Sequence, residues 1–353
     1  MSFEDIPFKS NPNFKFKEKV TDKSDCLSAT YQFDCFQNKN GDVILISPFF
    51  DVKNAIKRDY HISLINLRNN EVIKTLEAHK DRVLTVHYFQ DNNKNDYFIS
   101  ADKKNKVIVW DLSNNCEKLF EFDFKYESFI YSCLLIFEGN KKYVVASSIG
   151  SNNITKVIDM ADSNNVIDIN ESKDKNVYFL AHWINEDSEK NNRKHIIIQN
   201  CKNLILFSEF PSGVTYHKVE INQEYPFCQA GIVFKNQGKD YYAASFTYGL
   251  VLIIDLAKKE EVKRIIMNDV HLYSFVRWSD HYLLLNDCLQ RRIIVMDMLD
   301  NYKIKSKIVI PEMDFEKFIK KVKHPKYGEC LLSSGVDWSI KLLVNRSILN
   351  ENI

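Results

Sequence analysis

Short apolar runs recur along the chain at nearly constant spacing, and six of the seven end in a polar residue. The seven runs are Ile62–Asn66, Val107–Asp111, Thr155–Asp159, Leu204–Ser208, Val251–Asp255, Ile293–Asp297 and Ile340–Val344. Measured between their last residues, the successive steps are 45, 48, 49, 47, 42 and 47 residues. Each run is almost continuously apolar, which is typical of a strand covered on both faces. The chain therefore reads as seven copies of one β-rich unit.

The same order of segments surrounds each run. In the second unit an apolar segment (83–89) is followed by a second (97–101), by the buried run (106–111) and by a more alternating segment (117–122). This order predicts a four-stranded antiparallel meander. Such a sheet has two apolar faces, and radial repetition buries each face against a neighbour. We expect an all-β fold, a seven-bladed β-propeller.

We expect one propeller domain over residues 1–353, with an N-terminal segment at 1–22. The predicted blades span about 25–77, 78–123, 124–170, 171–222, 223–267, 268–310 and 311–353, the last completed by 14–20. Residues 14–20 alternate between apolar and charged positions, and they would close the ring by pairing with the last blade, because closure removes an exposed sheet edge. A short interaction motif in a flexible tail is the alternative for this segment.

One unit carries a family signature. Ala78-His79, Asp81 to Val86, Ile99 to Asp102 and Val107 to Asp111 together resemble a WD40 repeat, and residues 332–343 resemble the second half of another. The other five units match only in spacing and apolar pattern. The resemblance implies a propeller that binds other proteins and closes its ring with the N-terminal strand.

The resemblance also implies a set of blade-locking residues, in which a His, a Ser or Thr, a turn Asp and a Trp form a hydrogen-bonded chain. The positions that match are His79, Ser100, Trp110, Asp59 and Asp337. The second unit has Lys104 where the family has the turn Asp, and no unit holds all four members. We therefore expect the blades to depend mainly on apolar burial and on ladder hydrogen bonds.

Two stretches depart from the repeat pattern. Phe315, Phe318, Ile319 and Val322 fall on one helical face after Pro311, so a short helix within 311–324 competes with a strand there. Residues 71–86 are also rich in helix formers, but the WD-type pattern covers them and should override local propensity.

Composition and charge narrow the possible partners. The 353 residues contain 48 Lys and Arg against 47 Asp and Glu, a net charge of +1, so no global field attracts nucleic acid or an anionic membrane. The eight cysteines form no CxxC pair and have no His at ligand spacing, and no signal-peptide pattern is present. We expect a cytoplasmic protein, with a nuclear location also possible, that binds no metal and no cofactor.

Catalytic motifs are absent from the sequence. It contains no G-x-S-x-G, no H-E-x-x-H, no Gly-rich phosphate loop and no EF-hand spacing. We therefore expect a protein that is not an enzyme. A metal-assisted propeller hydrolase stays open as an alternative, because such enzymes gather carboxylates around the axial channel. The carboxylates that would have to converge are Glu127, Glu224, Asp269 and Asp314.

Two binding motifs of propellers are matched only weakly. Gln290 to Ile293 contains the two arginines of a phosphoinositide motif Phe-Arg-Arg-Gly but neither its Phe nor its Gly, and Trp110 to Ser113 lacks the Arg of the ubiquitin-ligase motif Trp-Asp-x-Arg. The basic cluster Lys320, Lys321, Lys323, His324 and Lys326 is more typical of a solvated face than of an RNA or lipid site.

The loops on one face of the predicted propeller remain as the partner surface. Loops on a rigid scaffold are common binding sites, and aromatic and Arg side chains anchor interfaces. The candidate partner-binding residues are Tyr126, Tyr225, Tyr248, Tyr273, Trp338, Arg58, Arg82 and Arg291. We expect a non-catalytic scaffold for protein–protein interaction in a multiprotein complex, monomeric outside it. A reader of a short peptide or modified side chain at the channel mouth is the other binding alternative.

Overall fold

The computed structural model describes residues 8–10, 16–17, 32–50, 60–126, 128–148, 155–169, 177–185, 193–200, 204–221, 228–310, 316–335 and 339–345. Two compact units divide the chain. The first unit combines Met1–Val86 with Asp269–Ile353, and the second unit is His87–Asn268.

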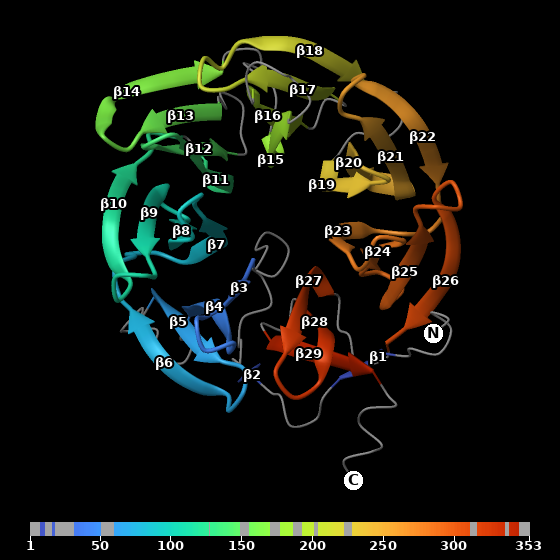
Figure 1. Ribbon diagram of the computed structural model, residues 1–353, viewed down its shortest axis with the longest axis horizontal. Coiled ribbons are helices and arrows are strands. Elements are labelled where there is room, and N and C mark those ends of the chain that lie inside the picture. The colour runs from blue at the N-terminus through green and yellow to red at the C-terminus, as the bar shows by residue number, and fades with distance from the viewer. Residues whose placement is uncertain are drawn as a thin grey trace. The chain divides into compact units, whose positions relative to one another are not determined.

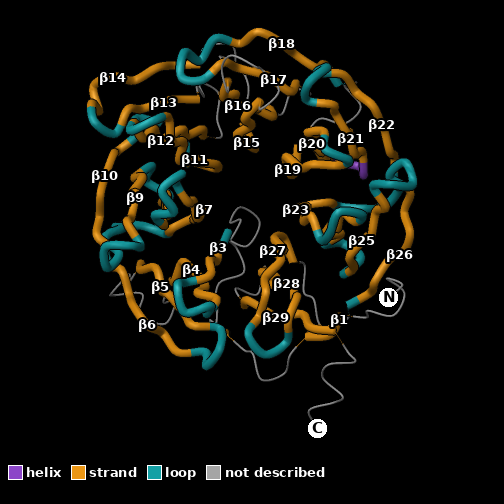
Figure 2. The backbone as a smooth tube through the Cα atoms, in the orientation of Figure 1, coloured by secondary structure: helices purple, strands orange, loops and turns teal. Residues whose placement is uncertain are grey.

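The described strands form seven antiparallel sheets, each built from four consecutive strands or completed by the N-terminal segment (Figure 1). This arrangement confirms the predicted all-β fold class, a seven-bladed β-propeller. Within the described residues the single helical element is the three-residue 3-10 turn η3 (Thr247–Gly249) (Figure 2).

The first unit contains three of the sheets. Blade 1 comprises β3 (Asp34–Gln37), β4 (Val43–Phe50), β5 (Tyr60–Asn66) and β6 (Glu71–Leu76). Blade 6 comprises β23 (Leu272–Arg277), β24 (Tyr282–Asp287), β25 (Arg292–Asp297) and β26 (Lys303–Val309). Blade 7 comprises β27 (Glu316–His324), β28 (Gly328–Gly335) and β29 (Ser339–Asn345), with β1 (Phe8–Ser10) and β2 (Phe16–Lys17) paired to β29.

Blade 2 comprises β7 (Val83–Gln90), β8 (Asp96–Asp102), β9 (Lys106–Asp111) and β10 (Glu117–Asp123). The boundary between the two units in the chain, after Val86, falls within β7. Blades 3 to 5 lie in the second unit. Blade 3 comprises β11 (Ile130–Glu138), β12 (Lys141–Ser148), β13 (Thr155–Asp159) and β14 (Asp162–Ile169). Blade 4 comprises β15 (Val177–Asn185), β16 (Arg193–Asn200), β17 (Leu204–Glu209) and β18 (Thr215–Glu220). Blade 5 comprises β19 (Cys228–Asn236), β20 (Lys239–Phe246), β21 (Leu250–Asp255) and β22 (Glu260–Ile266).

All seven predicted buried runs lie in the third strand of a blade. The third strand β21 is buried at every position and β9 at all but its first and last residue, whereas the fourth strand β26 alternates between exposed and half-buried residues and β10 does so from Leu119 on. A third strand has a sheet partner on both sides and apolar layers on both faces, so it selects continuous apolar sequence. A fourth strand has only one face covered, so its side chains keep the two-residue alternation between exposed and half-buried positions.

A β-bulge recurs near the start of the first strand. It interrupts the register between the first and second strands of five described blades, as between Ile130 and Ser132 in β11 and between Leu272 and Ser274 in β23. The residue after the bulge links neighbouring blades, because Ser132 Oγ accepts a hydrogen bond from Leu180 N (3.3 Å) and Ser274 Oγ from Ile319 N (3.1 Å). The bulge thus re-aims one side chain toward the next blade.

Blades 4 and 5 share a buried polar bridge in the second unit. Gln199 is fully buried on β16, its Nε2 donates to Ser245 O (3.2 Å), and Tyr242 Oη donates to its Oε1 (2.7 Å). Apolar side chains of both blades, including Phe207 and Leu252, surround this bridge. A buried amide requires these partners, because an unsatisfied polar group in an apolar layer is destabilising.

Tyr242→Phe is expected to lower the free energy of unfolding by about 2 kcal/mol, because it removes the donor to a buried amide oxygen without changing the ring. Urea denaturation measures the change. Tyr248→Phe is the matched control, since that side chain is 64 % exposed, and its effect should stay within about 0.5 kcal/mol. Equal effects of the two substitutions would show that the bridge adds nothing to stability.

Blade 2 preserves part of the predicted blade lock. Trp110 Nε1 donates to Ser100 Oγ (2.9 Å), and Trp110, Ser100 and His79 are all buried. Lys104 lies in the turn between β8 and β9, where its backbone N donates to Asp102 Oδ1 (2.9 Å). Asp59 and Asp337 lie outside the described residues.

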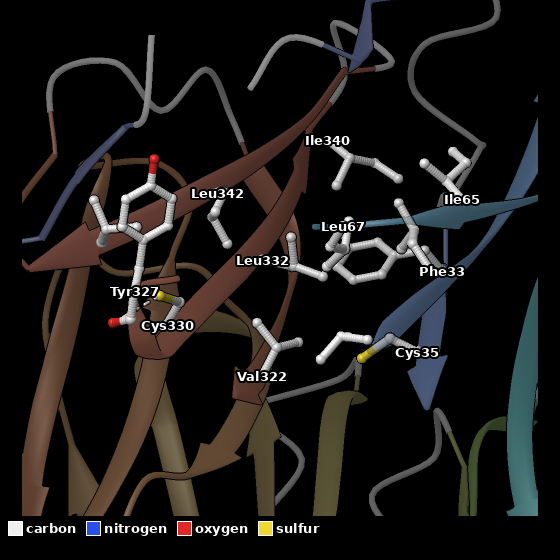
Figure 3. Packing of buried hydrophobic residues seen from close by; sticks show 13 residues of the cluster. Phe33, Cys35, Ile65, Leu67, Val322, Tyr327, Cys330, Leu332, Ile340 and Leu342 are labelled. Carbon is white, nitrogen blue, oxygen red and sulfur yellow. Dashed lines mark hydrogen bonds between the residues drawn. The ribbon is translucent and has the colours of Figure 1, made fainter. Parts of the chain in front are cut away.

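An apolar cluster joins blades 1 and 7 within the first unit (Figure 3). Phe33, Leu67, Leu332 and Leu342 are buried together there. His324 is part of the same junction, because its Nε2 bonds Leu67 O (2.9 Å) while its Nδ1 accepts the backbone N–H of Lys326 (3.1 Å). Since Nδ1 accepts, the ring is neutral with its proton on Nε2.

Lys320 and Asp34 form a second link between these two blades. Lys320 Nζ, on β27, bonds Asp34 Oδ1, on β3. Burial lowers the pKa of Lys320 to about 8, so the ammonium stays mostly protonated at neutral pH beside the carboxylate. This lysine of the predicted basic cluster is therefore occupied inside the fold.

The N-terminal segment pairs with the last blade, as predicted. β1 pairs antiparallel with β29 from Phe8 opposite Asn345 to Ser10 opposite Leu343, and β2 pairs Phe16 with Ile340. Of the strand predicted over 14–20, the described residues Phe16–Lys17 (β2) pair with β29. A second paired strand, β1, lies upstream at Phe8–Ser10. Both use the edge of β29 that is opposite to β28.

Within the range 311–324, where a helix competed with a strand, residues 316–324 form a strand, and residues 311–315 lie outside the described part of the chain. β27 covers Glu316–His324 and pairs with β28 through the turn at 325–327. The helical spacing of Phe318, Ile319 and Val322 is therefore not used as one face; Ile319 and Val322 are buried in different clusters, on opposite sides of the sheet. Pairing with β28 overrides the local helical preference.

Candidate functional site

Antiparallel pairing places two kinds of loop at the same end of each blade. In blade 6, Asp287 at the end of β24 pairs with Leu272 at the start of β23 and with Arg292 at the start of β25, and Arg292 pairs with Val309 at the end of β26. We call this the upper end of a blade. It carries the loop into the first strand and the turn between the second and third strands, which are the loops predicted to bind partners.

Several predicted residues fall outside the described part of the chain. They are the partner-binding candidates Arg58, Tyr225 and Trp338 and the carboxylates Glu127, Glu224 and Asp314. The remaining carboxylate, Asp269, is exposed in the loop before β23. Within the described ranges, no group of three or more His, Cys, Asp or Glu side chains could hold a metal ion.

Tyr126 is largely used by the fold. Its ring stacks on Phe124 at 5.4 Å, its hydroxyl donates to Ala146 O (2.9 Å), and Asn105 Nδ2 donates to its carbonyl (3.3 Å). Burial raises the pKa of Tyr126 well above its ordinary value. The side chain joins blades 2 and 3, so only a small part of it faces solvent.

Tyr248 has the opposite character. It is 64 % exposed in the turn between β20 and β21, whereas Phe246 and Leu250 on either side are fully buried. Its backbone has φ 60° and ψ 23°, the left-handed region, which is unfavourable for a residue with a Cβ atom. Gly249 follows with φ 75°, and its carbonyl accepts Met267 N (3.0 Å), so the turn is fixed to the neighbouring loop.

The upper end of blade 6 brings together two other predicted residues. Tyr273 is the extra residue of the bulge in β23 and is partly exposed, and Arg291 is exposed in the turn between β24 and β25. The carbonyl of Arg291 accepts Ile310 N (2.9 Å). Leu289, in the same turn, is 48 % exposed. This end therefore presents apolar and basic groups from one tight turn.

The sequence did not single out the buried ion pair beneath that turn. Asp287, whose side chain has no exposed surface, accepts Arg292 Nε at 2.7 Å through Oδ2 and His271 N at 3.1 Å through Oδ1. The sequence feature that could have predicted this ion pair is an Asp at the end of the second strand of a blade together with a basic residue at the start of the third. Blade 2 has the same pattern in Asp102 and Lys106.

The remaining predicted groups are engaged in different ways. Arg82 is half-buried in the loop before β7, with its backbone N bonded to Asp81 Oδ1 (2.7 Å). Lys321 Nζ bonds Trp278 O and Glu329 and lies over the Trp278 ring at 4.8 Å. Lys326 lies over the Tyr327 ring at 5.2 Å. Four of the five residues of the basic cluster therefore make contacts within the fold, three of them with a neighbouring blade.

Comparison with known proteins gives no assignment. The chain matches no family model and no curated protein. Searched over its described residues, the chain contains no helix that is both long and apolar enough to cross a bilayer.

Proposed function

We propose that the protein is a non-catalytic scaffold that binds other proteins through the upper ends of its blades and acts in a multiprotein complex, as the resemblance to WD40-repeat propellers implies. Rigid sheets support this proposal, because they hold short turns in fixed positions and so reduce the entropy lost on binding. The WD-like unit at residues 78–111 supports the family assignment through its Trp110–Ser100 bond.

Tyr248 carries the proposal. An exposed Tyr in a left-handed turn is disfavoured for the fold itself, since Gly or Asn would occupy that position with less strain. Backbone strain alone does not mark a binding residue, since the exposed Gln237 also has a positive φ; what separates Tyr248 is the aromatic ring that it presents to solvent. Tyr is also among the residues that most often anchor interfaces, because it buries a large area with few rotatable bonds.

Tyr248→Asn is expected to raise stability by about 0.5 to 1 kcal/mol and to weaken partner capture about tenfold or more, because it relieves backbone strain and removes the aromatic anchor. Thermal unfolding measures the first effect. The second is measured by quantitative mass spectrometry of proteins captured from lysates of the native organism, followed by titration of each purified partner.

Gln237→Asn is the matched control for this experiment. Gln237 also has a positive φ (49°) and is exposed, but it lies in the turn between β19 and β20, at the opposite end of the same blade. It should gain similar stability and retain every partner. Undiminished capture by Tyr248→Asn would remove Tyr248 from the partner surface, and the absence of any specific partner would overturn the scaffold proposal.

A further inference from the structure

The geometry of blade 6 points to an anion-recognition site: Arg292 binds a carboxylate or phosphate group carried by a protein partner. The inference rests on the proposed function in one respect, that the anion belongs to a protein. The site consists of Arg292 and Asp287, with the exposed turn Leu289–Arg291 beside them.

Asp287 holds the guanidinium of Arg292 in a fixed position. The carboxylate side chain has no exposed surface, while the Arg292 side chain retains 18 % of its surface in solvent. The bond from Nε to Oδ2 is 2.7 Å long, which is typical of a charge-assisted hydrogen bond. An arginine whose Nε is hydrogen-bonded to a buried carboxylate samples fewer rotamers than an unpaired surface arginine does.

The backbone around the pair fixes the carboxylate in turn. Asp287 Oδ1 accepts His271 N, and the carbonyl of His271 accepts Cys288 N at 3.1 Å, so the two loops of this end hold each other. The bond from Ile310 N to the carbonyl of Arg291 adds the end of the fourth strand. Three separate segments therefore position one guanidinium.

Only part of the guanidinium is used inside the protein. Asp287 takes Nε, and among the described residues neither Nη nitrogen has a hydrogen-bond or ion-pair partner. A guanidinium offers five N–H donors in a planar fork, and the two Nη groups form an edge that matches two oxygens of a carboxylate or phosphate. Because the fork is already oriented, binding costs little further side-chain entropy.

The corresponding position in blade 2 shows that the buried Asp does not need an arginine. Asp102 Oδ1 accepts the backbone N–H groups of Lys104 (2.9 Å) and Lys106 (3.0 Å). Lys106, which occupies the register position of Arg292, bonds Glu121 on the fourth strand and also interacts electrostatically with Asp102. A lysine therefore serves beside the buried carboxylate of blade 2, so such a carboxylate does not by itself require the planar guanidinium of Arg292.

The surroundings favour a peptide as the carrier of the anion. Leu289 is 48 % exposed, and Gln290 and Arg291 are exposed next to it. An apolar side chain beside an oriented guanidinium suits a partner segment that has an acidic or phosphorylated residue flanked by an apolar one. We therefore assign the site to a protein segment rather than to a lipid surface.

The test uses the full chain and three degenerate 12-residue peptide pools with a central phosphoserine, glutamate or alanine. At least one of the two anionic pools should bind about tenfold more tightly than the alanine pool, and Arg292→Lys should abolish that preference although it keeps the charge, because Lys lacks the planar fork. The preferred anionic pool identifies the group. Vesicles containing phosphatidylinositol phosphates form a further arm.

Arg277→Lys is the matched control, because Arg277 also pairs with an Asp in blade 6 but at the opposite end, where Asp280 is 89 % exposed. It should leave the preference intact. Equal binding of all three pools, equal loss in both variants, or binding only to the vesicles would overturn the inference. Loss of partner capture in Tyr248→Asn with no anion preference would leave the scaffold proposal standing and refute this site alone.

Discussion

Removal of residues 1–22 is expected to lower the free energy of unfolding by about 3 kcal/mol or more, because it strips the outer strand from blade 7. β1 and β2 pair with β29 at Phe8–Ser10 and Phe16–Lys17. Without them the edge of β29 loses its ladder partners while its buried residues Ile340, Leu342 and Leu343 come closer to solvent. The other six blades keep their own fourth strands.

Thermal and urea unfolding of two truncations separates the strands from the tail. Removal of residues 1–7 leaves both paired segments and should not change the unfolding transition. Removal of residues 1–22 should lower the transition by several degrees and expose a sheet edge, which self-association at raised concentration would report. Identical transitions for the two truncations would contradict a structural role of β1 and β2.

The sequence could predict the sheets because burial leaves a direct trace in it. The third strands β9 and β21 have sheet partners and apolar layers on all sides, so their residues are almost uniformly apolar and recur at blade spacing. The fourth strands alternate because one of their faces is exposed to solvent. The strand β27 was ambiguous because only its pairing with β28 excludes a helix, and that pairing is not local in the sequence.

The candidate site could be predicted only in part. Aromatic and Arg residues in turns were visible, but whether a ring is exposed depends on packing, and this separates Tyr248 in solvent from Tyr126 against Phe124. The left-handed backbone of Tyr248 has no signal in residue type, because Tyr rarely adopts it. Arg292 could not be recognised as an oriented arginine from the sequence, because only the pairing of β24 with β25 places Asp287 opposite it.

Acidification from pH 7.5 to pH 5 is expected to destabilise the protein by about 2 kcal/mol through His87 alone. Burial lowers the pKa of His87 from 6.5 to about 4, and the pKa of His324 is lowered in the same direction, chiefly by burial. Below pH 6.5 the unfolded chain takes up protons at these rings while the folded chain does not. The contribution of His87 to stability is therefore complete above pH 6.5 and is lost as the pH falls toward 4, and that of His324 falls in the same direction.

Carboxylates change the stability of the protein at lower pH than the histidines do, so the two effects can be measured separately. The pKa of Glu121 is lowered to about 2 by hydrogen bonds from Lys106 and Lys118, and its stabilising effect is lost only as the pH falls below about 4.5. Urea unfolding of the wild type at pH 7.5 and at pH 5 gives the total change in stability, and His87→Gln should remove about 2 kcal/mol of that change. His281→Gln, at an exposed position, should leave it as in the wild type. If His87→Gln retains the full acid sensitivity, the ring of His87 is not kept neutral by the fold, and the loss of stability at pH 5 arises from another group.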